Sequence, residues 1–372
     1  MSTISKKLTS VSRRVRRSRA PFALVAAALA LGAAMPLAAA KPRPPVESQA
    51  ARSIDEGMFV SINGVEQWVT VRGSDRRNPV LLILHGGPGL GLSNAAPLFA
   101  GWEAHYTIVQ WDQPGTGATY ARNIGRDVGP LTVERYTRDG IAVADFARKH
   151  LGTRRVALLG FSWGTLLGVE MVQRRPDLFS AYIGSAQVVS GPKGTLLGYQ
   201  LAIAAARKRG DTAAVKALET AGPPPYASLA PYMVRQQYAV APTAEEAPRL
   251  QAFMQAALSP PPADAHYVAH GLPAYDVMKV FVETWGALSQ AQLDWDAEKL
   301  GLKFRMPVYI FQGAEDINTP ATMAMDWCAR ISAPAKACAT IPGAGHSTIV
   351  FPNEILALLD QHVRPGLVKR GG

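Results

Sequence analysis

Seven short runs of apolar or β-branched residues recur along the chain and predict β-strands. The later runs are almost continuously apolar, which is typical of strands buried on both faces of a parallel sheet. The predicted strands are MFVSI (58–62), QWVTVRG (67–73), VLLIL (80–84), YTIVQW (106–111), RVALLG (155–160), AYIGS (181–185) and PVYIF (307–311).

Segments with the helical spacing of apolar residues lie between these strands or follow them. They are LTVERYTRDGIAVADFARKHL (131–151), TLLGVEMVQRRP (165–176), ATMAMDWCARI (321–331) and NEILALLDQHV (353–363). Strand and helix therefore alternate, with glycine-rich turns where strands end. This pattern predicts an α/β fold with a mostly parallel, doubly wound sheet.

The alternation stops between about residues 190 and 300 and resumes after residue 306. In this stretch the sequence predicts helices that are interrupted by proline-rich turns such as GPPPY (222–226) and SPPPA (259–263). Ligands of open α/β sheets bind at the carboxyl ends of the strands. We therefore expect the helical insertion, residues 191–300, to form a cap over the strand ends.

Positive charge is concentrated at the N-terminus. The whole chain has a formal net charge of +11, and residues 1–40 contain seven of its 39 basic residues and no acidic ones. Without them, 32 basic residues face 28 acidic ones, a net charge of +4. Because the remainder shows no long basic stripe, we expect no nucleic-acid partner.

The same N-terminal segment resembles an export signal. A basic stretch is followed by the apolar run PFALVAAALALGAAMPLAAA (21–40), in which Ala38 and Ala40 form an A-x-A-like cleavage site. An uncleaved membrane anchor is the alternative. Paired arginines suggest the twin-arginine route without excluding the general one. We predict an exported, periplasmic or secreted protein with no membrane association after cleavage.

These features divide the chain into five parts. They are a signal peptide (1–40), a linker (41–54), the first part of the core (55–190), a helical cap (191–300) and the second part of the core (301–372).

Two cysteines, Cys328 and Cys338, enclose a short proline-containing segment. In an oxidising compartment such a pair can form a disulfide. The alternative is two free, buried cysteines. Because no cysteine or histidine cluster has the spacing of a zinc site, we expect no metal.

The segment GFSWG (160–164) places Ser162 between a predicted strand and a predicted helix. Strand, sharp turn and helix form the context of a nucleophile elbow, where flanking glycines avoid collisions with neighbouring elements. The alternative is that the glycines only permit close packing and Ser162 caps the helix.

HGGPG (85–89) follows the strand VLLIL and carries little side-chain bulk. Its exposed N–H groups can donate to a developing oxyanion together with the residue after the nucleophile. The predicted donors are Gly87 or Gly86 and Trp163. A dinucleotide-binding loop is excluded because no G-x-G-x-x-G register fits, so no cofactor is expected. A plain turn remains the alternative.

A serine nucleophile needs an oriented base. His346 lies in the loop GAGHS (343–347), and Asp316 follows the strand PVYIF. Ser162, Asp316 and His346 thus occur in the order nucleophile, acid, histidine. Glu315 competes with Asp316 for the acid role, but Asp316 is better placed at the loop tip.

Five motifs together resemble the prolyl aminopeptidase (proline iminopeptidase) branch of the α/β-hydrolases over most of residues 55–365. They are HGGPG (85–89), WDQPGTG (111–117), GFSWG (160–164), GAED (313–316) and GAGHS (343–347). The resemblance implies a capped α/β-hydrolase fold, a Ser162–Asp316–His346 triad, an oxyanion hole in HGGPG, and release of N-terminal residues, often proline, from peptides.

Two departures from the family pattern concern the substrate pocket. Pro114 stands where the family commonly has an arginine that helps to tie its loop to its neighbours, and Thr119 lies near the usual serine. Family peptidases also hold the free amine of the substrate with cap carboxylates. No cap glutamate can be matched to that role, and solvated helix-face charge is the default for Glu219, Glu245, Glu246 and Glu283.

The combined prediction is an exported serine hydrolase that acts through an acyl-enzyme on a small molecule or short peptide. Its favoured form is an aminopeptidase that releases N-terminal proline or small apolar residues. A carboxylesterase or other amidase with the same triad is the first alternative. A non-catalytic binding protein of this fold is the second. The sequence leaves the oligomeric state open.

Overall fold

The computed structural model describes residues 52–226, 228–258 and 265–368. The predicted signal peptide (1–40) and all but the last residues of the predicted linker (41–54) lie outside the described residues. Within the described ranges, no helix combines the length and the hydropathy needed to cross a bilayer.

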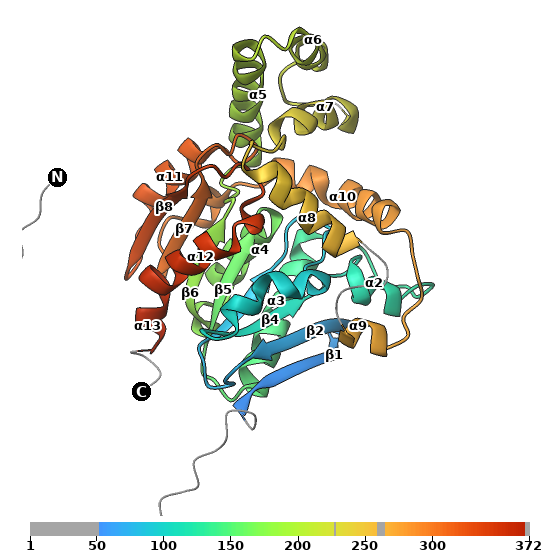
Figure 1. The fold of residues 1–372 in the computed structure, drawn as a ribbon, viewed down its shortest axis with the longest axis vertical. Helices are drawn as coiled ribbons and strands as arrows, with labels where there is room; N and C mark the ends of the chain where they lie inside the picture. The colour runs from blue at the N-terminus through green and yellow to red at the C-terminus, as the bar shows by residue number, and fades with distance from the viewer. Residues whose placement is uncertain (1–51, 227, 259–264, 369–372) are drawn as a thin grey trace, which may run out of the picture. The chain divides into compact units, whose positions relative to one another are not determined.

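An eight-stranded sheet in the order β1-β2-β4-β3-β5-β6-β7-β8 forms the centre of the described chain (Figure 1). β1 and β2 pair antiparallel, β2 pairs antiparallel with β4, and the other neighbours are parallel. The strands are β1 (Ile54–Ile62), β2 (Val65–Gly73), β3 (Val80–Leu84), β4 (Thr107–Trp111), β5 (Val156–Phe161), β6 (Phe179–Ser185), β7 (Val308–Gly313) and β8 (Lys336–Ile341). The predicted α/β class and all seven predicted strands are confirmed.

The eighth strand, β8, was not predicted. It lies at the edge of the sheet, and of its six residues only Ile341 is buried. An edge strand of this kind carries no continuous apolar run, so its sequence KACATI has no clear strand signal.

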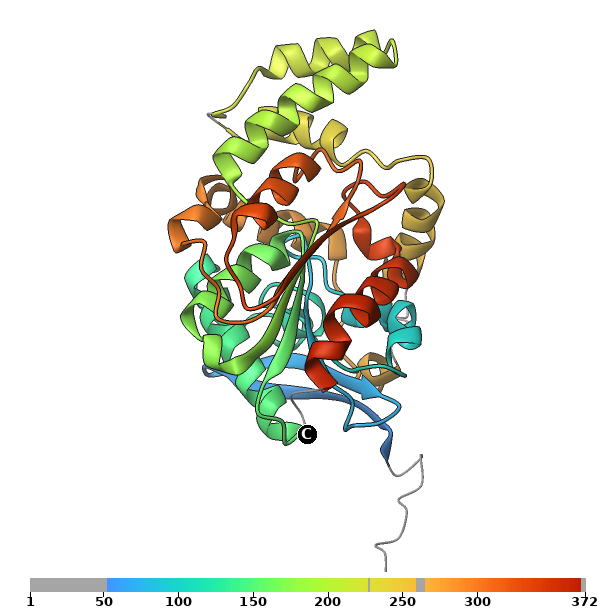
Figure 2. The same cartoon turned by 90° about the vertical axis from the view of Figure 1, so that its left-hand side faces the viewer.

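Helices cover both faces of the sheet. α3 (Val133–His150), α4 (Trp163–Arg174) and α11 (Ala321–Arg330) pack on one face through one large apolar cluster. The 3₁₀ helix η1 (Ser93–Trp102), α12 (Pro352–Leu358) and the following π-turn η5 (Leu359–Val363) pack on the other. In Figure 2 the red C-terminal helices and the green α4 lie on opposite sides of the strands. Shorter helices are α2 (Gly117–Arg122) and α13 (Arg364–Val368).

Helices also make up most of the described part of residues 191–300, which we call the cap. They are α5 (Gly191–Lys208), α6 (Thr212–Ala221), α7 (Leu229–Ala239), α8 (Glu246–Leu258), α9 (Ala265–Ala269), α10 (Val277–Asp294) and the 3₁₀ helix η3 (Ala297–Leu300). They connect β6 to β7, two strands that pair directly in the sheet. The chain therefore leaves the sheet for this insertion and returns beside the strand from which it left.

The strand order reverses around β3, which has β4 on one side and β5 on the other. At such a switch point the loops that follow the strands diverge and leave a crevice at their carboxyl ends. Leu84 at the end of β3 pairs with Gly160 near the end of β5. The loop with Gly86 and the turn with Ser162 therefore emerge side by side.

A disulfide joins Cys328 of α11 to Cys338 of β8. It ties the edge strand to the helix that precedes it along the chain. Cys328 is fully buried, and Cys338 packs partly against the same apolar cluster.

Reduction of this disulfide is expected to lower the free energy of unfolding by about 2–3 kcal/mol, because the open chain regains loop entropy when unfolded. Urea midpoints of the oxidised and the reduced protein measure the effect, with thiols counted by mass spectrometry after alkylation. A Cys328→Ala/Cys338→Ala variant shows how the reductant acts on a chain without thiols. Equal midpoints for the oxidised and the fully reduced protein would contradict the prediction.

Candidate active site

Ser162 occupies a sharp turn between β5 and α4, with φ 49° and ψ −116°. A left-handed φ is costly for a residue with a side chain and persists only where the surroundings enforce it. Both flanking glycines are required by close contacts. A Cβ on Gly160 would lie 2.5 Å from the Gly164 carbonyl oxygen, and one on Gly164 would lie 2.3 Å from the Leu84 carbonyl oxygen. The turn is therefore a strained elbow that holds the serine at the carboxyl end of the sheet.

The structure brings the three predicted site residues together. The Oγ atom of Ser162 lies 3.0 Å from Nε2 of His346. The other ring nitrogen of His346, Nδ1, lies 3.1 Å from Oδ2 and 3.3 Å from Oδ1 of Asp316. A chain of hydrogen-bonding groups thus runs from serine through imidazole to carboxylate.

Asp316 is almost fully buried, and hydrogen bonds fix its carboxylate. Oδ1 accepts the backbone N–H groups of Asn318 and Thr319, each at 2.9 Å. Oδ2 accepts from the Gln312 amide at 2.9 Å and from the Thr319 hydroxyl at 2.6 Å. The competing acid, Glu315, is exposed. The buried carboxylate is thus the one that faces the imidazole.

The predicted oxyanion donors lie beside the elbow. A Cβ on Gly86 would be 3.1 Å from the Phe161 carbonyl oxygen and 3.4 Å from Cβ of Ser162, so the main chain of the loop closely approaches Ser162. Gly87 has φ +112°, a conformation that favours glycine. Trp163 is the first residue of α4, and an N–H group at that position has no partner within the helix.

His85, the residue before these glycines, was not singled out from the sequence. It is buried, and this burial lowers its pKa to about 4, so the ring is neutral at pH 7. Nε2 accepts the backbone N–H of Gln113 at 3.2 Å. Nδ1 therefore carries the proton and donates to the Gly86 carbonyl at 2.8 Å. Because C=O and N–H point in opposite directions across a trans peptide, this bond directs the Gly87 N–H away from His85.

The loop that lacks the family's arginine is held by other contacts. The hydroxyl of Tyr136 donates to the Pro114 carbonyl, and the hydroxyl of Thr284 in α10 donates to the Gly115 carbonyl at 2.9 Å. The indole N–H of Trp163 donates to the side-chain oxygen of Gln113 at 3.1 Å. Proline at position 114 therefore leaves the loop tied both to the core and to the cap.

A cavity of about 750 Å³ opens above Ser162 and His346. Half of its lining residues come from α7, α8 and α10 of the cap, and Gly86 and Gly87 also line it. Its exposed lining is mostly apolar, and no Asp, Glu, Lys or Arg occurs among its described lining residues. The described lining thus forms an apolar chamber that contains Ser162 and His346.

The four cap glutamates considered for amine binding, and Glu298 of η3, are absent from the described lining of this cavity. Glu219 is exposed and pairs with Arg207, and Glu283 is exposed near Lys279. Glu245 packs against Gly343. Glu246 is buried, and its carboxylate accepts the backbone N–H of Ser347, next to His346, and that of Thr243. It therefore holds the histidine loop against the cap.

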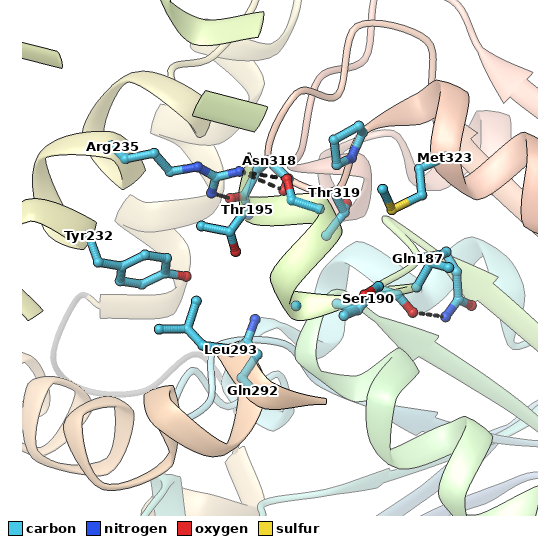
Figure 3. Close-up of a pocket in the computed structure, with 15 residues that line it drawn as sticks. Gln187, Ser190, Thr195, Tyr232, Arg235, Gln292, Leu293, Asn318, Thr319 and Met323 are labelled. Atoms are coloured by element: carbon cyan, nitrogen blue, oxygen red, sulfur yellow. Dashed lines mark hydrogen bonds between the residues drawn. The ribbon is translucent and has the colours of Figure 1, made fainter. Parts of the chain in front are cut away.

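Arg235 of α7 also ties the cap to the loop that contains Asp316 and Asn318. Nothing in the sequence distinguished it from a surface arginine. It is 1% exposed and lines a small second cavity of about 30 Å³ (Figure 3). Its guanidinium donates to the side-chain oxygen of Asn318 and, at 3.1 Å, to the Asn318 carbonyl. Burial lowers the pKa of Arg235. The Asn318 amide nitrogen lies 3.1 Å from Nε2 of His346, so the arginine positions a residue that contacts the site.

Gly198 of α5 provides the space for this guanidinium. A Cβ there would lie 1.8 Å from Nη2 of Arg235 and 2.5 Å from the Ile317 carbonyl oxygen. Gly198→Ala is therefore expected to lower the free energy of unfolding by about 1–3 kcal/mol, the usual cost of overpacking. Its kcat should also fall, because the substitution displaces Arg235 or the loop with Asn318.

Gly194→Ala, one turn earlier in α5, is the matched control. A Cβ there would meet only atoms at 3.7 and 3.9 Å, which are ordinary contacts. Alanine should therefore be neutral or stabilise the helix by about 1 kcal/mol. Urea unfolding and kcat of the two variants are measured together. Equal stability of the two variants would refute the steric argument.

Within the described parts of the chain, no group of three or more His, Cys, Asp or Glu side chains has the arrangement of a metal site.

Two curated proteins are similar to this chain over part of its length. A protein named probable aminopeptidase from Bacillus subtilis is 34% identical over 142 residues, which cover 38% of this chain and 44% of that protein. A protein named probable proline iminopeptidase from Streptomyces coelicolor is 32% identical over 133 residues, 35% of this chain and 39% of that protein. The matched region thus spans less than half of either relative.

Solved structures share the fold over a longer stretch. The proline iminopeptidase of Mycobacterium smegmatis superimposes with a TM-score of 0.56 at 24% identity, covering 85% of this chain and 100% of that one. A proline iminopeptidase-related protein of Thermus thermophilus gives a TM-score of 0.56 at 19% identity, covering 84% and 99%. The family model described as the alpha/beta hydrolase fold matches residues 79–352. The chain therefore belongs to the α/β-hydrolase family and, within it, resembles the prolyl aminopeptidase branch.

Proposed function

We propose that this chain is an exported serine hydrolase that cleaves amides or esters through an acyl-enzyme. Two hydrogen-bond distances are the main support for this proposal. Ser162 Oγ lies 3.0 Å from His346 Nε2, and His346 Nδ1 lies 3.1 Å from Asp316 Oδ2. Nucleophile and base within hydrogen-bond reach, with the base oriented by a third group, is the arrangement that activates a serine.

In this proposal the ionised Asp316 accepts a hydrogen bond from the Nδ1–H group of His346, which keeps the proton on Nδ1. Nε2 then takes the Ser162 proton as the serine oxygen attacks the carbonyl carbon. The oxyanion accepts hydrogen bonds from the N–H groups of Trp163 and of Gly87 or Gly86. His346 then gives its proton to the leaving group as the carbon–heteroatom bond breaks. A water molecule, deprotonated by His346, hydrolyses the ester formed on Ser162.

The names of the curated relatives support an aminopeptidase that releases N-terminal proline or small apolar residues. The same chemistry serves a carboxylesterase or another amidase. The two forms differ in one requirement, because an aminopeptidase must also hold the charged amine of its substrate. Because no described lining residue is an Asp, Glu, Lys or Arg, the cavity favours a carboxylesterase or another amidase over an aminopeptidase.

Labelling with a fluorophosphonate, which phosphonylates activated serines with release of fluoride, tests whether the chain is a serine hydrolase. Mass spectrometry of the labelled protein is expected to locate the adduct on Ser162, and a Ser162→Ala variant should take up none. Absence of the adduct on Ser162, or equal labelling of the variant, would leave a non-catalytic binding protein of this fold as the better interpretation.

Export is proposed from the basic N-terminal stretch and the apolar run that ends at Ala40. Fractionation of a Gram-negative host, followed by N-terminal sequencing of the protein in the periplasm and medium, tests it. A mature chain that begins at Lys41 is the expected result. A full-length chain retained in the membrane fraction would support the alternative of an uncleaved anchor.

A further inference from the structure

The cavity above Ser162 presents apolar side chains from three cap helices. They include Met233 and Val234 of α7, Phe253 and Met254 of α8, and Phe281 and Trp285 of α10. Core residues such as Leu90, Phe161 and Ile349 continue the apolar surface toward Ser162. Apart from the reactive serine and histidine, its polar lining side chains are neutral amides and hydroxyls. From the residues that the structure describes, a ligand in this chamber therefore meets few polar groups and no charged side chain.

The apolar surface continues outward to the rim of the cavity. Leu229 and Met233 of α7 and Val282 of α10 line the cavity and remain 37%, 49% and 58% exposed. Such a rim, open to solvent and continuous with an apolar chamber, suits a ligand whose long axis is itself apolar.

The described lining of this chamber offers a charged amine no counter-ion. Removing an ammonium group from water is unfavourable unless a carboxylate or several hydrogen bonds replace its hydration. The buried cap carboxylate, Glu246, already accepts the N–H groups of Thr243 and Ser347. The amides of Gln236, Gln237, Gln292 and Asn318 offer only neutral acceptors. An uncharged acyl group loses no such hydration and gains apolar burial with each methylene.

We propose that the site hydrolyses esters and amides of uncharged, extended apolar acyl groups. This inference rests on the proposed acyl-enzyme function. A free amine next to the scissile carbonyl lowers the rate, because its charge would enter the apolar chamber. The cap thus selects the acyl group by the absence of charge, and Ser162 forms the same ester bond as in any serine acyl transfer.

Two substrate series test this selection. In p-nitrophenyl esters from acetyl to octanoyl, kcat/KM is expected to rise with chain length, up to about fourfold per added methylene. In a second pair, alanine p-nitroanilide and its N-acetyl derivative contain the same scissile bond and leaving group. The acetylated compound should react at least tenfold faster in kcat/KM. Rates that do not change with acyl length, or faster cleavage of the free amine, would overturn the inference.

A carboxylate introduced at the rim should reverse the preference. Met233→Glu is compared with Met233→Gln, which has nearly the same shape without the charge. The ratio of free-amine to acetylated rates should rise at least tenfold in the glutamate variant alone. Met278→Glu controls for added surface charge, because Met278 is exposed on α10 outside the lining. Equal ratios in all three variants would count against the inference.

Labelling of Ser162 distinguishes failure of this substrate inference from failure of the serine-hydrolase proposal. If Ser162 reacts with a fluorophosphonate and the free amine is preferred, the inference fails and the serine-hydrolase proposal stands. If Ser162 does not react, both fail.

Discussion

Ser162→Ala is expected to lower kcat/KM by about 10⁴- to 10⁶-fold, because residues of a serine triad act as a unit and no other group can form the acyl-enzyme. Residual activity would come from the oxyanion donors and from binding. The measurement uses whichever ester or arylamide the wild-type protein cleaves fastest. The variant should retain the fold, because the turn is fixed by the contacts of Gly160 and Gly164 and not by the hydroxyl.

Ser332→Ala, which changes an exposed serine before β8, is the matched control and should keep wild-type activity. Urea midpoints within error of wild type would show that the loss in Ser162→Ala is chemical. Activity within tenfold of wild type in Ser162→Ala would show that another residue is the nucleophile.

Asp316→Asn is expected to lower kcat by about 10⁴-fold, because it changes which ring nitrogen of His346 carries the proton. Two backbone N–H groups face Oδ1, so the amide oxygen of the new asparagine must occupy that position. Its NH₂ group then lies where Oδ2 was and donates to Nδ1 of His346. The imidazole proton moves to Nε2, and the ring can no longer accept the proton of Ser162.

The neighbouring carboxylate provides the control for this substitution. Glu315 is exposed, and Glu315→Gln should keep full activity. Both variants are compared by kcat/KM and by the rate at which Ser162 is labelled. If Asp316→Asn reacts as fast as wild type while Glu315→Gln is impaired, the acid role belongs to Glu315.

Much of the fold could be predicted because its signals are local. Strands buried on both faces must be apolar along their whole length, so β3, β5 and β7 are visible as continuous runs. β8 has no such run because it lies at an edge. The elbow is equally local, since its glycines are required by contacts within a strand, a turn and a helix.

The site was predictable in its reactive groups and less so in their surroundings. Ser162 and Asp316 each follow a predicted strand, and parallel strands bring their carboxyl ends to one edge. His346 follows β8, which was not predicted, and was found from its glycine-flanked loop and its place in the chain order. His85 is the first residue of the HGGPG motif, but its buried, neutral state depends on the backbone of Gln113, 28 residues later. Arg235 carries no sequence signal, because its partner Asn318 is 83 residues away.

The sequence by itself determined the α/β class, the order of the motifs and the residues of the candidate triad, because each depends on periodicity or on a turn of a few residues. Only the tertiary structure decided what surrounds the triad. It showed that Arg235 holds the loop of Asn318. It also showed that the described residues lining the chamber above Ser162 include no cap glutamate and no other charged side chain. The reason is physical: the polarity of a cavity depends on which side chains from distant segments point into it, and packing sets those directions.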